Sequence, residues 1–431
     1  MKTRILSLLC ALVLVLGMIP SAMALEGETT RTADTLATLG LVQGNGTDYA
    51  LDTPATRAHA AVLLVRLAGA EQAAKNDLWI SGFRDVPAWA HTPITYAAHQ
   101  GWITGVTTLD FKPNNTITAN AWCTMLLRML GYRDKDGDFA VSDAASFARR
   151  IGLVSQSYEG TMTRGDVFQT MYDALFFTYK DANETVMDRL VKRGICSRTA
   201  ANALGLLDKR LTARQIADRH MAAVFCLDTY ESIDYFYAEQ PAGNASGFFI
   251  TADGLAVTNY HSIEGRPFAM ATTVTGETYP VEEVIYYDPA IDIAVIRVSR
   301  TSTEKKTTSA FACLELTGTG EIRNGDVVYA ISNPLGLGLA ISSGIIGSTA
   351  HDVERYQLPC VVNSADISQG SSGGALLNEF GKVIAITSGA YTYGNNMYLA
   401  VPVNPAMEAD LSVEGMTLEE VMKAEAEKAE E

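Results

Sequence analysis

The chain has 431 residues, of which 48% are hydrophobic, and a formal net charge of −16 at pH 7. This length exceeds that of one compact domain, and the apolar fraction is sufficient for hydrophobic cores, so two or three domains are expected. The excess of acidic residues disfavours nucleic acid and anionic membrane surfaces as partners.

Residues 1–24 have the pattern of a secretory signal peptide. Lys2 and Arg4 form a basic start, residues 5–19 are almost wholly apolar, and the Ala-Met-Ala sequence at 22–24 fits a cleavage site. An uncleaved anchor is the alternative, but the apolar stretch is short for a bilayer span. We therefore expect a secreted protein with no membrane span after cleavage.

Five cysteines remain after this cleavage: Cys123, Cys196, Cys226, Cys313 and Cys360. They lie far apart and lack the paired spacing of a metal or redox site, so we expect neither a metal nor a cofactor. Because their number is odd, at least one thiol is expected to be free. Most should be small buried apolar residues.

A weak internal repeat follows the signal peptide, with predicted units at residues 25–78, 79–133 and 134–180. The second unit is the clearest. In it, Thr118 has the position of a helix N-cap and precedes apolar residues at helical spacing. Each unit is therefore predicted to contain a pair of helices.

Two units open their second helix with a Thr-Arg pair, Thr56-Arg57 and Thr163-Arg164. This pattern resembles S-layer homology repeats, which anchor proteins to polymers of the bacterial cell wall. The resemblance implies that Arg57 and Arg164 bind an anionic cell-wall polymer, and a guanidinium at a helix N-terminus suits a carboxylate ligand. The middle unit has Ala119 at this position. The alternative is that both arginines are ordinary surface residues.

Residues 181–213 are polar and helix-prone, and are predicted to be a helical linker to a domain at 214–408. The acidic C-terminal tail, residues 409–431, is rich in Glu, Ala and Lys from Thr417 onwards. It is predicted to be a solvated helix or a disordered segment.

A Gly-Ser-Ser-Gly-Gly run at residues 370–374 lies next to two apolar segments, 375–377 and 383–386. These segments, joined by a turn, predict a hairpin of buried strands. A loop poor in side chains can turn its backbone N–H groups towards one point, as an oxyanion hole requires. Such a run by itself is more often a flexible turn. Its rigid flanks make Ser372 a candidate nucleophile.

A serine nucleophile needs an imidazole base and a carboxylate that orients the imidazole. His261 follows a predicted hairpin of residues 247–250 and 255–258, joined by an Asp-Gly turn. Asp292 precedes an apolar run, where an unpaired carboxylate is costly. A pair of His261 and Asp292 would remove that cost.

Four blocks within residues 213–405 carry a resemblance to a known family: GFFITADGLAVTNYHSIEG, DPAIDIAVIRV, ISNPLGLGLAISSGIIG and NSADISQGSSGGALLNEFGKVIAI. They resemble the blocks of HtrA/DegP-type serine proteases with the trypsin fold. The resemblance implies an all-β, trypsin-like double β-barrel at residues 214–408. It assigns the catalytic triad to His261, Asp292 and Ser372.

The resemblance also assigns the oxyanion hole to the backbone amides of Gly370, Ser371 and Ser372. It places Ile367 in the specificity pocket, with Gly389 and Ala390 on the opposite wall. Such a pocket has an apolar floor and no acidic residue, so we expect cleavage after a small or medium aliphatic residue. The alternative is that these three residues only pack the barrel.

Two departures from the family stand out. Ser371 replaces a usual asparagine, which is a mild change because the hole uses backbone groups. No PDZ domain is expected after Pro405, so substrate capture by such a domain is not expected either.

Together these patterns predict a multidomain, cell-wall-anchored serine endopeptidase secreted by a bacterium, with all-α repeats before an all-β protease domain. Its expected partners are protein or peptide substrates and a cell-wall secondary polymer, with no nucleic acid. One alternative is a catalytically silent protease fold that serves as a cell-surface binding or scaffold module. Another is an unanchored protease with degenerate repeats.

Overall fold

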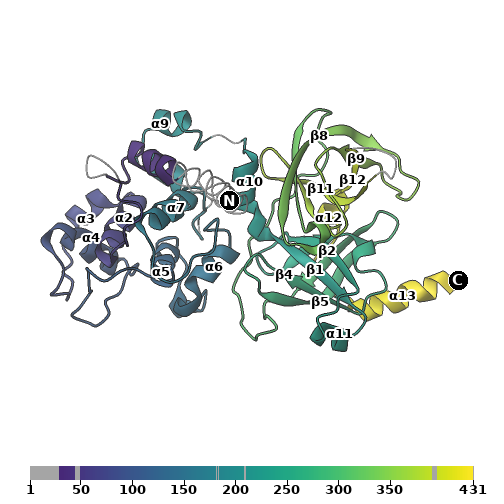
Figure 1. The fold of residues 1–431 in the computed structure, drawn as a ribbon, viewed down its shortest axis with the longest axis horizontal. Coiled ribbons are helices and arrows are strands. Elements are labelled where there is room, and N and C mark those ends of the chain that lie inside the picture. Colours follow the sequence, from purple (N-terminus) through teal and green to yellow (C-terminus); the bar gives the residue numbers. More distant parts are fainter. Residues whose placement is uncertain are drawn as a thin grey trace, which may run out of the picture. The chain divides into compact units, whose positions relative to one another are not determined.

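The computed structural model describes residues 29–43, 49–180, 182, 184–207, 210–390 and 396–430. The chain forms two compact units, Met1–Arg133 with Tyr158–Asp208, and Asp134–Ser157 with Lys209–Glu431 (Figure 1). The predicted signal peptide lies outside the described residues. In the part of the chain that is described, no helix has both the length and the apolar character needed to cross a bilayer.

The first unit is built from short helices. They lie at residues 29–38, α2 Arg57–Leu67, α3 Glu71–Asn76, α4 Ala88–His99, α5 Ala119–Met129, α7 Arg164–Leu175, α8 Val186–Lys192 and α9 Arg198–Ala203. The side chains of Thr56, Thr118 and Thr163 cap α2, α5 and α7 by accepting a hydrogen bond from the N–H three residues later. Each cap satisfies one of the free donors of a helix start, as predicted for Thr118.

The segments before α2, α5 and α7 form a closed ring of backbone hydrogen bonds. Ala55 N–H donates to Met162 O, Met162 N–H to Ile117 O, and Ile117 N–H to Ala55 O, at 2.9, 3.0 and 2.9 Å. The same three segments are joined by a second set of backbone bonds. In these, the N–H groups of Arg57, Ala119 and Arg164 donate to the carbonyls of Asn115, Gly160 and Thr53, each at 2.9 Å. Each segment therefore makes the same pattern of backbone contacts with the next one.

The second unit contains two closed antiparallel β-barrels (Figure 1). The first consists, in spatial order, of β1 Val224–Tyr230, β2 Gly243–Phe249, β3 Leu255–Thr258, β6 Ile293–Val298, β5 Thr278–Asp288 and β4 Phe268–Thr272. The second consists of β10 Ala375–Asn378, β11 Val383–Ala390, β12 Tyr398–Pro402, β9 Cys360–Asn363, β8 Ala340–His351 and β7 Val327–Ser332. Within the described ranges, each of these strands pairs with a neighbour on both sides, as closure of a barrel requires. The predicted double β-barrel is confirmed.

A hydrophobic cluster joins the two barrels. Phe248, Val257 and Ile293 enter it from the first barrel, and Ile331 and Ile386 enter it from the second. The hairpins predicted beside His261 and Ser372 are both present, as β2–β3 and β10–β11. These hairpins bring the loops that carry the candidate catalytic residues to the junction between the barrels.

Short helices connect and flank the barrels. They are η1 Asp134–Asp136, η2 Val141–Asp143, α6 Ala144–Arg150, α10 Ala213–His220, η3 Met221–Ala223, α11 Ile233–Tyr237, η4 Tyr260–Ser262, η5 Pro334–Gly336, α12 Asn404–Glu408 and α13 Leu418–Glu430. The segment predicted as the third repeat, residues 134–180, is divided, because 134–157 belong to the second unit. The predicted linker, 181–213, is divided too, because α8 and α9 belong to the first unit.

The C-terminal helix α13 covers part of the first barrel. Met416 exchanges two backbone hydrogen bonds with Val284 of β5, at 2.7 and 2.9 Å. Leu418 and Val421 are buried in the core of that barrel. The helix is therefore not fully solvated as the sequence predicted, because its apolar residues recur on one face and pack against β5.

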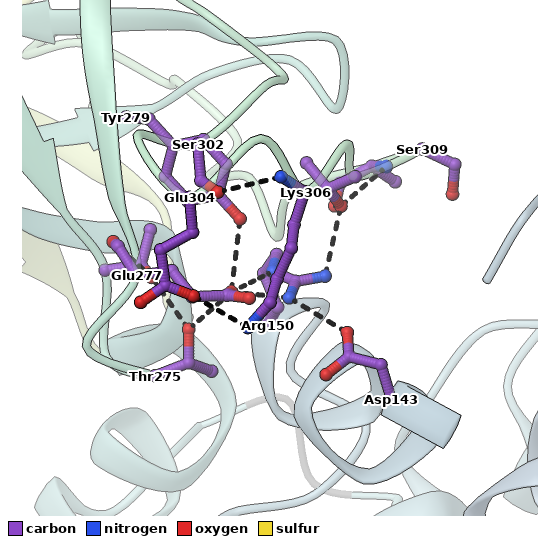
Figure 2. Close-up of polar contacts among 12 residues, drawn as sticks. Asp143, Arg150, Thr275, Glu277, Tyr279, Ser302, Glu304, Lys306 and Ser309 are labelled. Carbon is purple, nitrogen blue, oxygen red and sulfur yellow. Dashed lines mark hydrogen bonds and ion pairs between the residues drawn. The ribbon is translucent and has the colours of Figure 1, made fainter. Parts of the chain in front are cut away.

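Arg150, at the end of α6, ties residues 134–157 to the barrels of the second unit (Figure 2). Its Nε and Nη2 atoms lie 2.8 and 2.5 Å from Glu277 Oε2, and Nη2 lies 3.4 Å from Asp143 Oδ2. Nη1 donates to Thr308 Oγ1 at 3.3 Å, and the arginine side chain is only 4% exposed. Burial alone would raise the pKa of the Glu277 carboxyl, but the Arg150 guanidinium outweighs it and holds that pKa below its usual value.

We expect Arg150→Met to destabilise the second unit by about 3–5 kcal/mol, because it leaves the Glu277 carboxylate buried without its counter-charge. Native-state hydrogen exchange of peptides from β4 and β5 measures this loss. The double variant Arg150→Met/Glu277→Gln removes both charges and should recover most of the stability. Unchanged exchange in the single variant would contradict this role of Arg150.

Candidate active site

His261 lies in η4, directly after β3, and Asp292 immediately precedes β6. His261 Nδ1 is 2.8 Å from Asp292 Oδ2 and 2.9 Å from Oδ1, and the His261 backbone N–H donates to Oδ1 at 2.9 Å. Because a carboxylate only accepts, Nδ1 carries the proton of the neutral imidazole and Nε2 is left as an acceptor. This is the tautomer that a general base requires.

Asp292 is buried and has an unusual backbone conformation. It is only 3% exposed, and its φ of +59° lies in the left-handed region, which aspartate tolerates better than most residues. The Asn259 side chain donates to the Asp292 backbone carbonyl at 2.8 Å and supports this conformation. The turn therefore directs the carboxylate back at His261.

Ser388, on β11, donates a further hydrogen bond to Asp292 Oδ2, at 2.8 Å. Tyr356 OH lies 2.8 Å from Ser388 Oγ. Since Ser388 gives its own proton to the carboxylate, Tyr356 must be the donor in this second bond. Burial raises the pKa of the Tyr356 phenol, and the charge of Asp292 acts in the same direction, so Tyr356 stays a donor at neutral pH. No local sequence pattern marks Ser388 or Tyr356 as part of the site.

Ser372 lies in the loop before β10, and its Oγ donates to the backbone carbonyl of Ser388 at 3.0 Å. No hydrogen bond joins this hydroxyl to His261 within the described residues. Ser388 thus contacts Asp292 through its side chain and Ser372 through its backbone. Transfer of the Ser372 proton to His261 Nε2 requires the hydroxyl to turn away from Ser388.

The Ser372 loop is fixed by two buried residues of the first barrel. Ser246, on β2, donates its N–H to Ser372 O at 2.7 Å and its Oγ–H to Gly370 O at 2.8 Å. Asn259, after β3, accepts the N–H of Gly373 at 2.7 Å. These bonds hold the loop of one barrel on the strands of the other, so the three candidate catalytic residues share one site.

The three amides predicted to form the oxyanion hole differ in their bonding. Ser371 N–H donates to Ser368 O at 2.9 Å, whereas the N–H groups of Gly370 and Ser372 lack an acceptor among the described residues. Gly370 has φ +88°, and a Cβ there would lie 2.5 Å from Asn333 O, so the position requires glycine. Only Gly370 and Ser372 therefore keep the free donors that an oxyanion hole needs.

The predicted pocket residues lie on two chain segments. Ile367 is partly buried against the core of the second barrel. Gly389 and Ala390 end β11, after a bulge in its pairing with β12. The next residues, 391–395, lie outside the described residues.

An acidic residue directly precedes Ile367 in the chain. This residue, Asp366, accepts a hydrogen bond from Tyr398 OH. Tyr398 is the cross-strand partner of Ala390. The Tyr398 phenol thereby links Asp366 to the strand that pairs with β11.

The two arginines predicted to bind polymer begin α2 and α7 in the first unit. Arg57 donates to Phe111 O at 2.9 Å and Thr104 O at 3.0 Å, and its guanidinium lies 4.6 Å from the Phe111 ring centre. Arg164 donates to Tyr49 O at 2.9 Å and lies 5.3 Å from the Phe168 ring centre. Both guanidinium groups are thus held on aromatic rings by backbone carbonyls.

The remaining candidate ligands are the thiols and the acidic groups. All five cysteines of the described residues are free thiols, and Cys313 is exposed. Burial raises the pKa of the Cys360 thiol to about 11, with a contribution from the charge of Asp292. No group of three or more His, Cys, Asp or Glu side chains in the described ranges is placed to hold a metal ion.

Residues 245–386 match a family model described as a trypsin-like peptidase domain. The mitochondrial serine protease HTRA2 of Bos taurus is 34% identical over 161 residues, which cover 36% of this chain and 33% of HTRA2. A probable periplasmic serine endoprotease, DegP-like, of Bartonella henselae is 30% identical over 202 residues, which cover 44% of this chain and 38% of that protein. The solved HtrA-type protease AlgW with a tripeptide has a TM-score of 0.39 and 24% identity, and the match covers 46% of this chain and 62% of that one.

The chain spans only 33% to 44% of the length of the curated relatives that it matches. The family model covers part of both β-barrels and includes the segments that carry His261, Asp292 and Ser372. The curated relatives are named as serine proteases or serine endoproteases. This part of the chain is therefore similar to trypsin-like peptidase domains and to serine proteases of the HtrA and DegP-like type.

Proposed function

We propose that this protein is a serine endopeptidase that hydrolyses protein or peptide substrates through an acyl-enzyme intermediate. The observation that carries the proposal is the hydrogen-bonded pair of His261 and Asp292 at the barrel junction that also holds the Ser372 loop. Acyl transfer requires three groups: a buried acid, an imidazole with a free Nε2 and a serine on a rigid loop.

In the first half of the reaction, Ser372 Oγ attacks the substrate carbonyl carbon, and its proton passes to His261 Nε2. Asp292 keeps the imidazole oriented and stabilises the imidazolium that forms. The N–H groups of Gly370 and Ser372 bind the developing oxyanion. His261 then donates its proton to the leaving amine, and the C–N bond breaks.

In the second half, a water molecule attacks the acyl-enzyme while His261 takes a proton from it. The ester bond to Ser372 breaks, and His261 returns the proton to Ser372 Oγ. The Ser388 carbonyl that accepts the resting hydroxyl lies on β11, next to the predicted pocket. A substrate amide that binds this carbonyl would displace the hydroxyl and release it towards His261.

A fluorophosphonate probe tests this mechanism, because it reacts with a serine that a neighbouring base activates. We expect labelling of one residue, Ser372, by peptide mapping of the wild-type protein incubated with a peptide substrate. The variant His261→Ala lacks the base and should not be labelled. Labelling of another serine, or equal labelling of the variant, would contradict the assignment.

We further propose that the protein acts outside the cytoplasm, attached to the cell wall by its first unit. Three observations support this: the signal-peptide pattern, the periplasmic names of DegP-like relatives, and three similarly bonded segments, two of which end in a Thr-Arg pair that opens a helix. The repeat would be of the S-layer homology type. Its arginines, held on Phe111 and Phe168, would present their charge to an anionic cell-wall polymer.

The double variant Arg57→Ala/Arg164→Ala should sediment poorly with isolated cell walls while it still cleaves a soluble peptide. Each charge-assisted hydrogen bond to the polymer contributes about 1.5–3 kcal/mol, so losing two should abolish retention at micromolar protein. Arg66→Ala is the matched control, because Arg66 lies on α2 but pairs with Glu71 at 3.0 Å. Unchanged sedimentation of a double variant with native circular dichroism would show that the arginines do not bind the wall.

A further inference from the structure

Tyr356 lies in the segment between β8 and β9 of the second barrel, and this segment is bonded to the turn that carries Asp292. Gln357 N–H donates to the backbone carbonyl of Ala290, two residues before Asp292, at 2.8 Å. Tyr356 N–H donates to Val353 O at 2.9 Å and closes a turn within the segment. The backbone at Tyr356 is therefore fixed relative to the turn of Asp292.

The ring of Tyr356 is packed, which leaves its hydroxyl little freedom. It lies partly buried against a hydrophobic cluster of the second barrel that consists of Cys360, Val362, Leu399 and Val401. Tyrosine has only two side-chain torsions, so packing of the ring determines where the hydroxyl lies. The phenol oxygen is held in this way 2.8 Å from Ser388 Oγ.

The serine that receives this bond has a hydroxyl that can rotate about its own C–O bond. Ser388 is only 7% exposed, and its oxygen accepts the Tyr356 proton. Its own proton is thereby left for Asp292 Oδ2, at 2.8 Å. In such a chain each bond also polarises the next one and strengthens it. Removal of the phenol frees the Ser388 hydroxyl to rotate away from Asp292.

On these observations we propose that Tyr356 is a positioning residue for catalysis, which acts on the triad through Ser388. The inference rests on the proposed function of the site. Within the described residues, no hydrogen bond joins Tyr356 to Ser372 or His261. Tyr356 holds the Ser388 hydroxyl on Asp292, and Asp292 orients the imidazole that accepts the Ser372 proton.

Tyr356→Phe removes the phenol oxygen and keeps the ring against its apolar cluster. We expect kcat to fall about 2- to 10-fold, the net contribution of one neutral hydrogen bond. KM should stay close to that of the wild type, because the bond acts on the orientation of His261 and not on the binding of the peptide. Titration of active sites with the fluorophosphonate corrects kcat for any loss of folded protein.

A double-mutant cycle with Ser388→Ala distinguishes positioning from packing. Ser388→Ala removes the hydroxyl and keeps the backbone carbonyl that accepts Ser372 Oγ. Because Tyr356 acts through that hydroxyl, Tyr356→Phe should leave kcat unchanged in the Ser388→Ala background. A packing role of the tyrosine would lower kcat by the same factor in both backgrounds.

Tyr329→Phe is the matched control. Tyr329 is a buried tyrosine of the same barrel, and its hydroxyl donates to Leu211 O at 3.3 Å. The control variant also loses one tyrosine hydrogen bond, but this bond has no link to Asp292. Its kcat and KM should therefore equal those of the wild type.

The outcomes separate this inference from the proposed function. If the wild type cleaves the peptide and Tyr356→Phe has the same kcat, the inference is overturned while the peptidase function stands. Equal losses in the two backgrounds overturn it as well, and so does a wild-type kcat in Ser388→Ala alone. If the wild type neither reacts with the fluorophosphonate at Ser372 nor cleaves the peptide, the proposed function fails and the inference fails with it.

Discussion

Ser372→Ala should lower peptide hydrolysis by about 10⁶-fold, the loss associated with removing a triad nucleophile. Without Oγ, no acyl-enzyme forms, and only the oxyanion donors and substrate binding remain to assist attack by water. The fold should persist, because the bonds that fix the loop run from Ser246 to the backbone carbonyls of Gly370 and Ser372. Among the described residues, the Ser372 hydroxyl makes one hydrogen bond, to Ser388 O.

Casein zymography and a continuous peptide assay measure this loss. Ser368→Ala is the matched control, because it removes an exposed hydroxyl four residues before Ser372. The control should hydrolyse the peptide at nearly the wild-type rate. Equal hydrolysis by Ser372→Ala and the wild type would exclude the proposed mechanism.

Asp292→Asn should lower kcat by about 10⁴-fold without unfolding the protein. Three donors converge on the Asp292 carboxylate: the backbone N–H of His261, its Nδ1–H and the hydroxyl of Ser388. An asparagine offers one acceptor oxygen and one NH2 group. With the NH2 group facing Nδ1, the imidazole must carry its proton on Nε2, where it cannot accept the proton of Ser372.

The backbone should tolerate this change, because asparagine adopts the left-handed conformation of position 292 as readily as aspartate does. Thermal unfolding should therefore stay close to that of the wild type, while kcat falls. Asp288→Asn is the matched control from the same turn, where Asp288 accepts the N–H of Ala290 at 2.8 Å. Near-wild-type turnover of Asp292→Asn would show that another acid orients His261.

The sequence by itself was sufficient wherever a structural feature is encoded by neighbouring residues. The Asp-Gly turn predicted the hairpin of β2 and β3, and the apolar runs around residues 378–381 predicted that of β10 and β11. The Thr N-caps marked the starts of α2, α5 and α7. These signals are local, because turn geometry and capping depend on residues only a few positions apart.

The sequence also singled out His261 and Asp292, which the structure joins by a hydrogen bond. It did so because a carboxylate beside an apolar run requires a partner. The cost of a buried, unpaired carboxylate indicates that Asp292 needs a partner, but it does not indicate how many partners Asp292 has. Ser388 also donates to the Asp292 carboxylate, and Tyr356 is hydrogen-bonded to Ser388. No local sequence pattern marks either residue.

Only the tertiary structure decided the contacts that depend on barrel closure. The pairing of β11 with β12 places Tyr398 opposite Ala390, and Tyr398 donates its phenol to Asp366 of the segment before the Ser372 loop. The packing of α6 brings Arg150 to Glu277, which assigns residues 134–157 to the second unit. The physical reason is that such partners lie far apart in the chain, and the register of strand pairing and the packing of helices set which of them meet.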